Sequence, residues 1–173
     1  MNALIEPGII RELYAASLSS STIDLVVRGA CTLRPGVEGL SDRIRVRSIV
    51  GRLLEHSRVF IFENGGQPEV WAASADWMDR NLFRRVETCF PVEDPLLSQR
   101  IIAELDTFLQ DDRNAWLLGP EGAYTRAESV QGLSAQQTLM DGADRATIFG
   151  EPRRPDQASA PPRSARSSSD QPR

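Results

Sequence analysis

The chain has 173 residues, of which 40% are hydrophobic and 25% charged, proportions typical of one globular domain. It has no run of about 18 apolar residues, and its first residues lack the basic start and cleavage site of a signal peptide, so we expect no membrane span and a cytoplasmic protein. The formal charge of −4 is unevenly distributed, because residues 28–85 carry ten arginines against seven acidic residues, whereas residues 86–149 carry four against eleven.

Every basic residue in the chain is an arginine. A guanidinium stays charged at any working pH, and its fork of donors matches phosphate oxygens, which favours an anion-binding function. A genome rich in G and C would also replace lysine codons by arginine codons everywhere. This second explanation is the stronger one for the missing lysines, but it does not explain where the arginines cluster.

The two cysteines, Cys31 and Cys89, have neither CxxC spacing nor a histidine cluster near them. A zinc site is therefore not expected, and a disulfide is not expected in a reducing compartment. We expect both cysteines as small residues of the core.

The first third of the chain contains a predicted helix and one or two predicted strands. A proline at the first helical position and apolar residues at helical spacing predict a helix over residues 6–18. Residues 23–27 are short, β-branched and apolar, and they predict a strand that ends in a loop at Arg28. A loop rich in glycine and proline follows at residues 33–40. Residues 44–55 are ambiguous, with strand-like alternation first and a short helical pattern after it.

The middle of the chain predicts two hairpins, a further strand and a long amphipathic helix. The hairpins are expected at residues 59–74 and 115–125, the strand at residues 85–91 and the helix at residues 96–109. The turn of the first hairpin contains Asn64-Gly65-Gly66, residues that tolerate the positive φ of tight turns. Alternation of helices and strands predicts an α/β domain, or a mixed α+β sheet, with helices packed on a mixed sheet.

The end of the chain differs in composition from the rest. Beyond about residue 150 it consists largely of Pro, Ser, Arg, Gln and Asp, and it cannot bury enough apolar surface to offset the entropy of ordering. We therefore expect one domain over residues 1–150 and a disordered tail over residues 151–173.

His56 is the only histidine, the residue type that exchanges protons most readily near neutral pH. A lone histidine is usually structural, but this one lies where a polar segment enters a predicted strand, and Arg28 ends another. Ligands tend to bind at strand ends in α/β sheets. A phosphoryl group needs positive donors and a group that holds, donates or accepts at the entering or leaving oxygen. We therefore predict Arg28 and His56 as phosphate-binding residues, and His56 also as catalytic.

A second dense polar cluster follows the predicted strand at residues 70–74. Its members are Ser74, Asp76, Arg80, Asn81, Arg84 and Arg85. Asp76 and Asn81 could orient the histidine or cap a turn, and the arginines could face phosphate. For each arginine, an ion pair to Asp79 or Glu87 on a solvated surface is an equally good interpretation.

Four stretches of the sequence are distinctive in combination. They are residues 23–36 (IDLVVRGACTLRPG), 44–52 (IRVRSIVGR), 55–60 (EHSRVF) and 74–78 (SADWM). In their composition, order and spacing they resemble the final domain of the bacterial ATP-dependent polyphosphate kinases. The resemblance extends from Met1 to about Tyr124.

Members of that family have four domains, and each of the last two resembles half of a phospholipase D. They transfer the γ-phosphate of ATP reversibly to polyphosphate through a phosphohistidine, with magnesium. The resemblance therefore implies a phospholipase D-like domain, ATP or ADP and polyphosphate as ligands, and Mg²⁺ that accompanies the ATP and has no protein ligand in this chain.

The resemblance also implies roles for single residues. Arg28 matches the nucleotide-binding arginine of the family, and His56 matches its second histidine, which is not phosphorylated and assists transfer as a binding or acid group. Ser74 and Asp76 correspond loosely to the serine and the acid or amide of the phospholipase D signature. Arg58 stands where that signature has a lysine.

The match covers only the last part of the family's sequence. The phosphorylated histidine and the magnesium-binding arginines are therefore expected outside this chain, which the resemblance marks as an N-terminally truncated fragment, inactive by itself. Its expected partners are the missing kinase domains or a second copy of itself, and no nucleic acid. Two further functions stay open: a module that binds nucleotide or polyphosphate without turnover, and a remnant without function.

Overall fold

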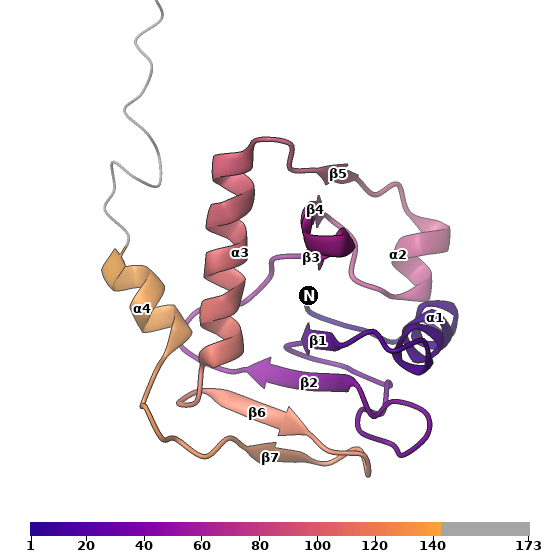
Figure 1. Ribbon diagram of the computed structural model, residues 1–173, viewed down its shortest axis with the longest axis horizontal. Helices are drawn as coiled ribbons and strands as arrows, with labels where there is room; N and C mark the ends of the chain where they lie inside the picture. Colours follow the sequence, from indigo (N-terminus) through magenta and orange to yellow (C-terminus); the bar gives the residue numbers. More distant parts are fainter. Residues whose placement is uncertain (143–173) are drawn as a thin grey trace, which may run out of the picture. The chain divides into compact units, whose positions relative to one another are not determined.

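The computed structural model of the protein describes residues 1–142, in which helices and strands alternate along the chain (Figure 1). In order, the elements are α1 (Pro7–Leu18), β1 (Ile23–Val26), β2 (Ile44–Ile49), β3 (Val59–Phe62), the 3₁₀ turn η1 (Asn64–Gly66), β4 (Glu69–Ala73), α2 (Asp79–Arg84), β5 (Cys89–Pro91), α3 (Pro95–Gln110), β6 (Ala115–Leu118), β7 (Tyr124–Arg126) and α4 (Ala135–Gly142). No helix in the described range is long and apolar enough to cross a membrane.

The strands form two sheets. The first is a four-stranded mixed sheet with the order β1-β2-β6-β7, in which β1 and β2 are parallel and the other neighbours antiparallel. The second is a three-stranded antiparallel sheet with the order β3-β4-β5. The long helix α3 packs against β1 of the first sheet and β4 of the second (Figure 1). The predicted α/β fold with helices on a mixed sheet is confirmed, and a separate antiparallel sheet accompanies it.

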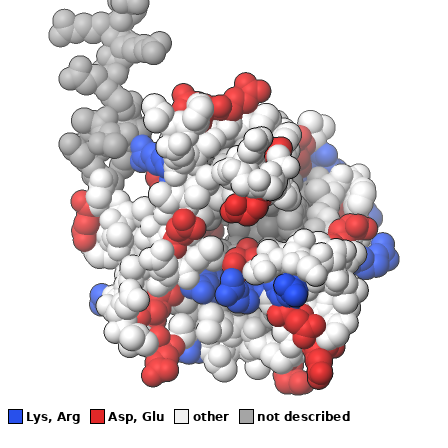
Figure 2. Space-filling model, viewed as in Figure 1, with Lys and Arg blue, Asp and Glu red and all other residues white. Residues whose placement is uncertain are grey.

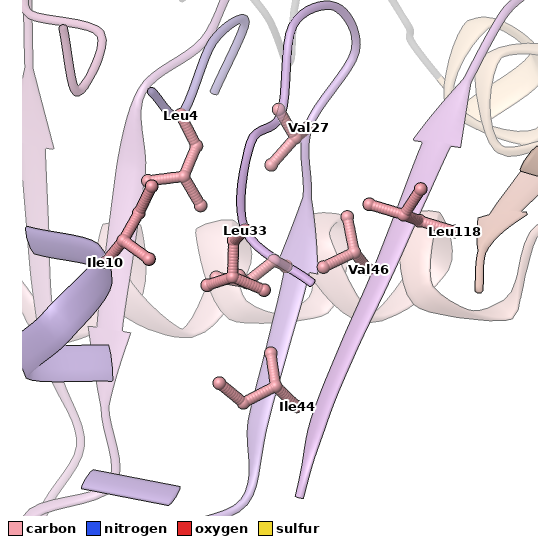
Figure 3. Close-up of a cluster of buried hydrophobic side chains, with 8 residues drawn as sticks. Leu4, Ile10, Val27, Leu33, Ile44, Val46 and Leu118 are labelled. Atoms are coloured by element: carbon pink, nitrogen blue, oxygen red, sulfur yellow. The ribbon is translucent and has the colours of Figure 1, made fainter. Parts of the chain in front are cut away.

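The hydrophobic core lies against one face of the mixed sheet. Along β2, Ile44 and Val46 are buried while Arg45 between them is exposed, the alternation expected of a strand with one face in the core. Leu4 and Ile10 bring the first residues and α1 onto this face. Among the described residues, the buried members of this cluster, seen in Figure 3, are Leu4, Ile10, Leu25, Val27, Leu33, Ile44, Val46 and Leu118.

Each of the two predicted long helices begins at a proline, and the carboxylate of the residue before that proline caps the helix. The carboxylate of Glu6 accepts a hydrogen bond from the backbone N–H of Ile9 (2.7 Å), and Pro7 fills the first helical position, where an N–H would have no helical partner. Asp94 caps α3 in the same way and precedes Pro95. The predictions of these two helices are confirmed.

Both predicted hairpins are also present. The turn between β3 and β4 contains three successive residues with positive φ: Asn64 at 41°, Gly65 at 65° and Gly66 at 90°. Glycine adopts this region without strain, and asparagine tolerates it better than most residues, so the residues that marked the turn in the sequence also build it. The second hairpin forms from β6 and β7.

The first residues of the chain join the two sheets. The N–H of Leu4 donates to the carbonyl oxygen of Ala30 (2.9 Å), in the segment that follows β1. The N–H of Ile5 donates to the carbonyl oxygen of Trp77 (2.9 Å), and the N–H of Trp77 donates to that of Ala3 (3.1 Å). Residues 1–5, which we call the N-terminal segment, therefore lie between the residues that follow β1 and those that follow β4.

The structure corrects several local expectations. Residues 50–55 contain no helix, because a bend follows β2 instead. The strand expected over residues 85–91 is limited to β5, and the short helices α2 and α4 were not expected. Cys89 is exposed in β5 and is not a core residue, whereas Cys31 packs partly buried against the core. The tail expected at residues 151–173 lies outside the described residues.

One carboxylate holds the loop that leads to α4. Oδ2 of Asp112 accepts hydrogen bonds from the backbone N–H groups of Val130 (2.7 Å), Gln131 (2.6 Å) and Gly132 (3.2 Å), and Oδ1 accepts one from Leu133 (2.7 Å). The bond from Gln131 is the largest of the effects on the pKa of Asp112, and together these bonds lower that pKa below its ordinary value. The ionised carboxylate and the ordered loop therefore stabilise each other.

We expect the loop at residues 130–133 to open in acid. Because the folded-state pKa of Asp112 is lowered, its stabilising effect is complete above the ordinary aspartate pKa of about 4 and is lost as the pH falls through the folded-state value. Hydrogen exchange of the four amides should therefore lose protection in acid, and Asp112→Asn should reduce protection already at neutral pH. Asp106→Asn, on the exposed side of α3, is the control. Full protection in Asp112→Asn at neutral pH would contradict the expectation.

Candidate functional site

The carboxylate of Asp76 lies where the antiparallel sheet meets the N-terminal segment. Asp76 follows β4, and only 4% of its surface is exposed. Oδ1 accepts hydrogen bonds from the N–H groups of Asn2 (2.7 Å) and Ala3 (3.2 Å) and from Nε of Arg58 (3.1 Å), while Oδ2 accepts one from Nη2 of Arg58 (2.8 Å). A carboxylate removed from water needs an opposite charge and hydrogen-bond donors, and these three residues supply both.

The protonation state of Asp76 follows from these contacts. Burial by itself would raise the pKa of the carboxyl group, but the hydrogen bonds from Arg58 and from the Asn2 and Ala3 amides outweigh burial and hold the pKa below its ordinary value. Asp76 is therefore ionised at neutral pH and balances the charge of Arg58. The contact is bidentate, the geometry in which a guanidinium and a carboxylate fit best.

Arg58 in turn holds His56. Nη1 of Arg58 donates to the carbonyl oxygen of His56 (3.0 Å) and lies 2.9 Å from Nδ1 of the ring, while Nη2 lies 3.1 Å from Nε2. A guanidinium has only donors and a neutral imidazole has one acceptor nitrogen, so one of the two ring contacts is a hydrogen bond in either tautomer. His56 is exposed, whereas only 13% of the Arg58 side chain is. A largely buried arginine thus orients a histidine that a ligand can reach.

Arg28 lies just beyond the end of β1, beside Asn2. Its Nε donates to Oδ1 of Asn2 (2.8 Å), and its carbonyl oxygen accepts from the hydroxyl of Ser48 (2.8 Å). Within residues 1–142 the two terminal nitrogens of this guanidinium have no hydrogen-bond partner. The side chain is therefore held at Nε, while both terminal nitrogens remain for a ligand.

A continuous series of hydrogen bonds connects the two predicted phosphate residues. We call it the Asp76 network; it runs through Arg28, Asn2, Asp76, Arg58 and His56. Arg28 follows the mixed sheet and His56 precedes the antiparallel sheet, so the network spans the junction of the two. Asn2 contributes its amide to the carboxylate and its side-chain oxygen to the guanidinium. No motif or spacing in the sequence marks Asn2, so it could not be predicted as part of the site.

Two other predicted site residues support turns near the Asp76 network. Asn81 is buried, and its Nδ2 donates to the carbonyl oxygen of Asp76 (3.2 Å), while its Oδ1 has no hydrogen-bond partner among the described residues. The hydroxyl of Ser74 donates to the carboxylate of Glu87 and accepts from the N–H of Thr88 (3.0 Å). Neither side chain contacts His56. Of the two roles suggested for Asn81, it therefore has the second, which is to support a turn.

Two of the arginines in and after α2, Arg84 and Arg85, form the surface pairs of the alternative interpretation. Arg84 lies 3.4 Å from Asp79, and Arg85 lies 4.0 Å from Glu87, with both arginines largely exposed. Arg80 is exposed as well. Pairs of this kind are screened by water and add little to stability. Within the described residues, no hydrogen bond or ion pair joins these side chains to the Asp76 network.

Other arginines of the positive central stretch are bound within the fold. Figure 2 shows arginine side chains gathered at the level of β2, bordered by acidic side chains. Arg45 of β2 forms a bidentate pair with Asp24 of β1 (2.7 Å for both bonds), and Nη1 of Arg47 donates to the carbonyl oxygen of Asp111 (3.3 Å). The positive charge that the sequence concentrates here is therefore partly neutralised by the protein itself.

Magnesium, which the family resemblance implies, does not fit the described residues as a protein-bound ion. Within residues 1–142 no three His, Cys, Asp or Glu side chains come close enough to hold a metal. Both oxygens of Asp76 are already bound by Arg58 and backbone amides. Mg²⁺ at nucleotide sites is bound by one or two carboxylates together with substrate phosphates. It could join this site only with a phosphate ligand.

The fold and the site define an α/β domain in which a buried arginine–carboxylate pair orients an exposed histidine. Comparison with known families identifies the family of this domain. The family model for polyphosphate kinase C-terminal domain 2 matches residues 1–137, and the chain belongs to this family.

Individual relatives agree with the family. Polyphosphate kinase of Xylella fastidiosa (strain Temecula1) is 60% identical over 127 residues, which cover 73% of this chain and 18% of the relative. That of Neisseria gonorrhoeae is 56% identical over 142 residues, covering 82% of this chain and 21% of the relative. The crystal structure of polyphosphate kinase from Porphyromonas gingivalis matches with a TM-score of 0.78 and 39% identity, covering 82% of this chain and 22% of that one. The chain thus spans about a fifth of the length of these relatives.

Replacement of Asp76 by asparagine should destabilise the fold strongly. The change leaves the mostly buried guanidinium of Arg58 without a counter-charge, and we expect a loss of about 3 to 5 kcal/mol in the free energy of unfolding. Urea denaturation measures this loss. Asp79→Asn, which breaks the exposed pair with Arg84, is the matched control and should change stability by no more than about 0.5 kcal/mol. Equal effects of the two substitutions would show that Asp76 has no special structural role.

Proposed function

We propose that this domain binds phosphate groups of ATP and polyphosphate during the phosphoryl transfer of a polyphosphate kinase, with Arg28 and His56 as its contacts. Membership in the family and the names of the relatives support the reaction. The observation that carries the choice of residues is the Asp76 network, which brings these two side chains into one hydrogen-bonded series. The relatives are much longer than this chain, so the complete reaction also uses parts of the enzyme outside it.

Arg28 is suited to hold a phosphate group. The bond from its Nε to Asn2 fixes the plane of the guanidinium and leaves both terminal nitrogens for two parallel bonds to phosphate oxygens, the geometry in which arginine binds phosphate best. The bond from Ser48 restrains its backbone. A donor that is already ordered loses little conformational entropy when the ligand arrives, which favours binding.

His56 acts in this proposal as a hydrogen-bond donor to the phosphoryl group. When one ring nitrogen accepts from Arg58, the neutral ring carries its proton on the other nitrogen. That nitrogen has no acceptor among the described residues, so we assign its N–H to a phosphate oxygen. A donor placed there stabilises the negative charge that develops on the oxygen during transfer. His56 holds an oxygen in this role and is not itself phosphorylated.

Mg²⁺ accompanies the nucleotide in this proposal and is bound by phosphate oxygens, since the described residues offer no cluster of carboxylates. We place the reaction in the cytoplasm, where ATP is available. The partners of the domain are the remaining domains of a polyphosphate kinase or a second copy of this chain.

A second candidate function is binding of nucleotide or polyphosphate without turnover. It is favoured by the chemistry of the Asp76 network, whose one carboxylate is occupied by Arg58 and two amides. Within the described residues, the network therefore offers donors for phosphate oxygens but no free base for an attacking group. Turnover distinguishes the two functions.

Calorimetric titration of the whole chain with Mg-ATP, and separately with long-chain polyphosphate, tests the phosphate contacts. Arg28→Ala should weaken both affinities about tenfold to hundredfold, because it removes bonds between ionised groups. His56→Ala should weaken them about threefold to tenfold, because it removes one donor. Arg11→Ala makes the same change of charge at an exposed position of α1 and should bind like the wild type.

Absence of binding by the wild type, or equal affinities of Arg28→Ala and the wild type, would reject the assignment. Formation of ADP from ATP and polyphosphate then separates transfer from binding. Turnover by this chain, alone or mixed with the rest of a related polyphosphate kinase, supports transfer. Binding without turnover in both settings supports the second function.

A further inference from the structure

Gln136, in the first turn of α4, is almost completely buried, with 4% of its surface exposed. Its side chain faces residues 51–55, the connection between β2 and His56. Oε1 accepts from the N–H of Leu53 (2.9 Å), and Nε2 donates to the carbonyl oxygen of Leu53 (2.9 Å) and to the carboxylate of Glu55. The amide thus pairs with both backbone groups of one residue, as a neighbouring strand would. We call these contacts the Gln136 clamp.

The connection held by the Gln136 clamp has no regular structure of its own. Residues 51–55 form bends and irregular backbone. The side chains of Leu53 and Leu54 are 47% and 63% exposed, so apolar packing does little to fix them. A segment of this kind would ordinarily exchange among conformations. The clamp ends at Glu55, directly before His56.

The Gln136 clamp rests on a firm support at the end of α3. Asp111 is only 1% exposed, and its Oδ2 accepts from the N–H of Ala135 (2.7 Å), the first residue of α4. The neighbouring Asp112 binds the four amides of the loop before it. Two adjacent carboxylates therefore fix the start of α4 and the place of Gln136.

We propose that Gln136 is a positioning residue of the phosphate site, which holds residues 53–55 so that the ring of His56 meets Arg58. This inference rests on the proposed function of His56. Gln136 acts through the backbone of the connection and leaves the contacts with the ligand to other residues. The histidine is thereby held from both sides along the chain, by the Gln136 clamp before it and by the Arg58–Asp76 pair after it.

Gln136→Met tests the clamp. Methionine keeps the length and helix propensity of glutamine but makes none of its hydrogen bonds. Gln137→Met, at the exposed next position of the same helix, is the matched control. Because His56 is the only histidine in the chain, the imidazole NMR signals can be assigned to it without ambiguity. Their chemical shifts report changes in the position and surroundings of the ring. Titration with inorganic tripolyphosphate measures binding, and thermal unfolding confirms that each variant is folded.

In Gln136→Met the imidazole signals should move away from their wild-type positions, and the affinity for tripolyphosphate should fall about threefold to tenfold, the effect of one or two hydrogen bonds. Gln137→Met should change neither.

Gly51→Ala perturbs the same clamp from the opposite side. A Cβ at Gly51 would overlap Oε1 of Gln136, the end of a flexible side chain that can move away. The substitution should therefore move the side-chain amide of Gln136 away from Leu53, although residue 136 is still a glutamine. The imidazole signals should move as they do in Gln136→Met. Gly142→Ala, where an added Cβ meets no atom of the described residues within 4 Å, is the control.

The inference is overturned if folded Gln136→Met keeps the wild-type imidazole signals. It is also overturned if that variant keeps the wild-type affinity for tripolyphosphate while His56→Ala loses affinity. If His56→Ala binds as well as the wild type, the proposed function of the histidine fails, and the imidazole signals of Gln136→Met and Gly51→Ala then decide the positioning role alone.

Discussion

The structure depends on the ion pair between Arg58 and Asp76. Removing two charges from water is costly, and a buried pair persists only where further hydrogen bonds satisfy both groups. Here the amides of Asn2 and Ala3 complete the shell of the carboxylate, and His56 accepts from two of the three remaining donors of the guanidinium, at its carbonyl oxygen and at one ring nitrogen. Because these residues come from separate stretches of the chain, the pair determines how the antiparallel sheet meets the N-terminal segment and, through that segment, the mixed sheet.

The same carboxylate organises both halves of the candidate site. Through the backbone of Asn2 it is linked to Arg28, and through Arg58 it is linked to His56. Its negative charge is balanced by Arg58, so the charge of Arg28 remains available for an anion. Donors that are ordered before the ligand binds, and whose supports are buried, are the arrangement by which proteins stabilise negative charge most effectively. Ordered donors of this kind are what the proposed binding of phosphate groups requires.

Those parts of the fold that local patterns encode could be predicted from the sequence. The helices α1 and α3 have apolar positions at helical spacing and a proline at the start, and the β3–β4 turn needs the residues that mark it. The helices α2 and α4 have only 6 and 8 residues and a mixed pattern, so no periodicity marks them. Arg28 and His56 could be selected by residue type. The hydrogen bonds that link and position them could not be predicted, because Asn2 and Asp76 lie 74 positions apart and Gln136 and Leu53 lie 83 apart.

These long separations have a consequence for the order of folding. Contacts between distant parts of a chain are slow to form, since the entropy of loop closure must be overcome before they contribute stability. The β3–β4 hairpin joins residues close in sequence and can form early, yet at that stage Asp76 still lacks the amides of the N-terminal segment and the connection before His56 still lacks α4. We therefore expect the Asp76 network to be among the last features to form. A partly folded chain would lack the ordered donors that the proposed binding of a polyanion needs, so on this proposal only molecules with a complete fold would bind it.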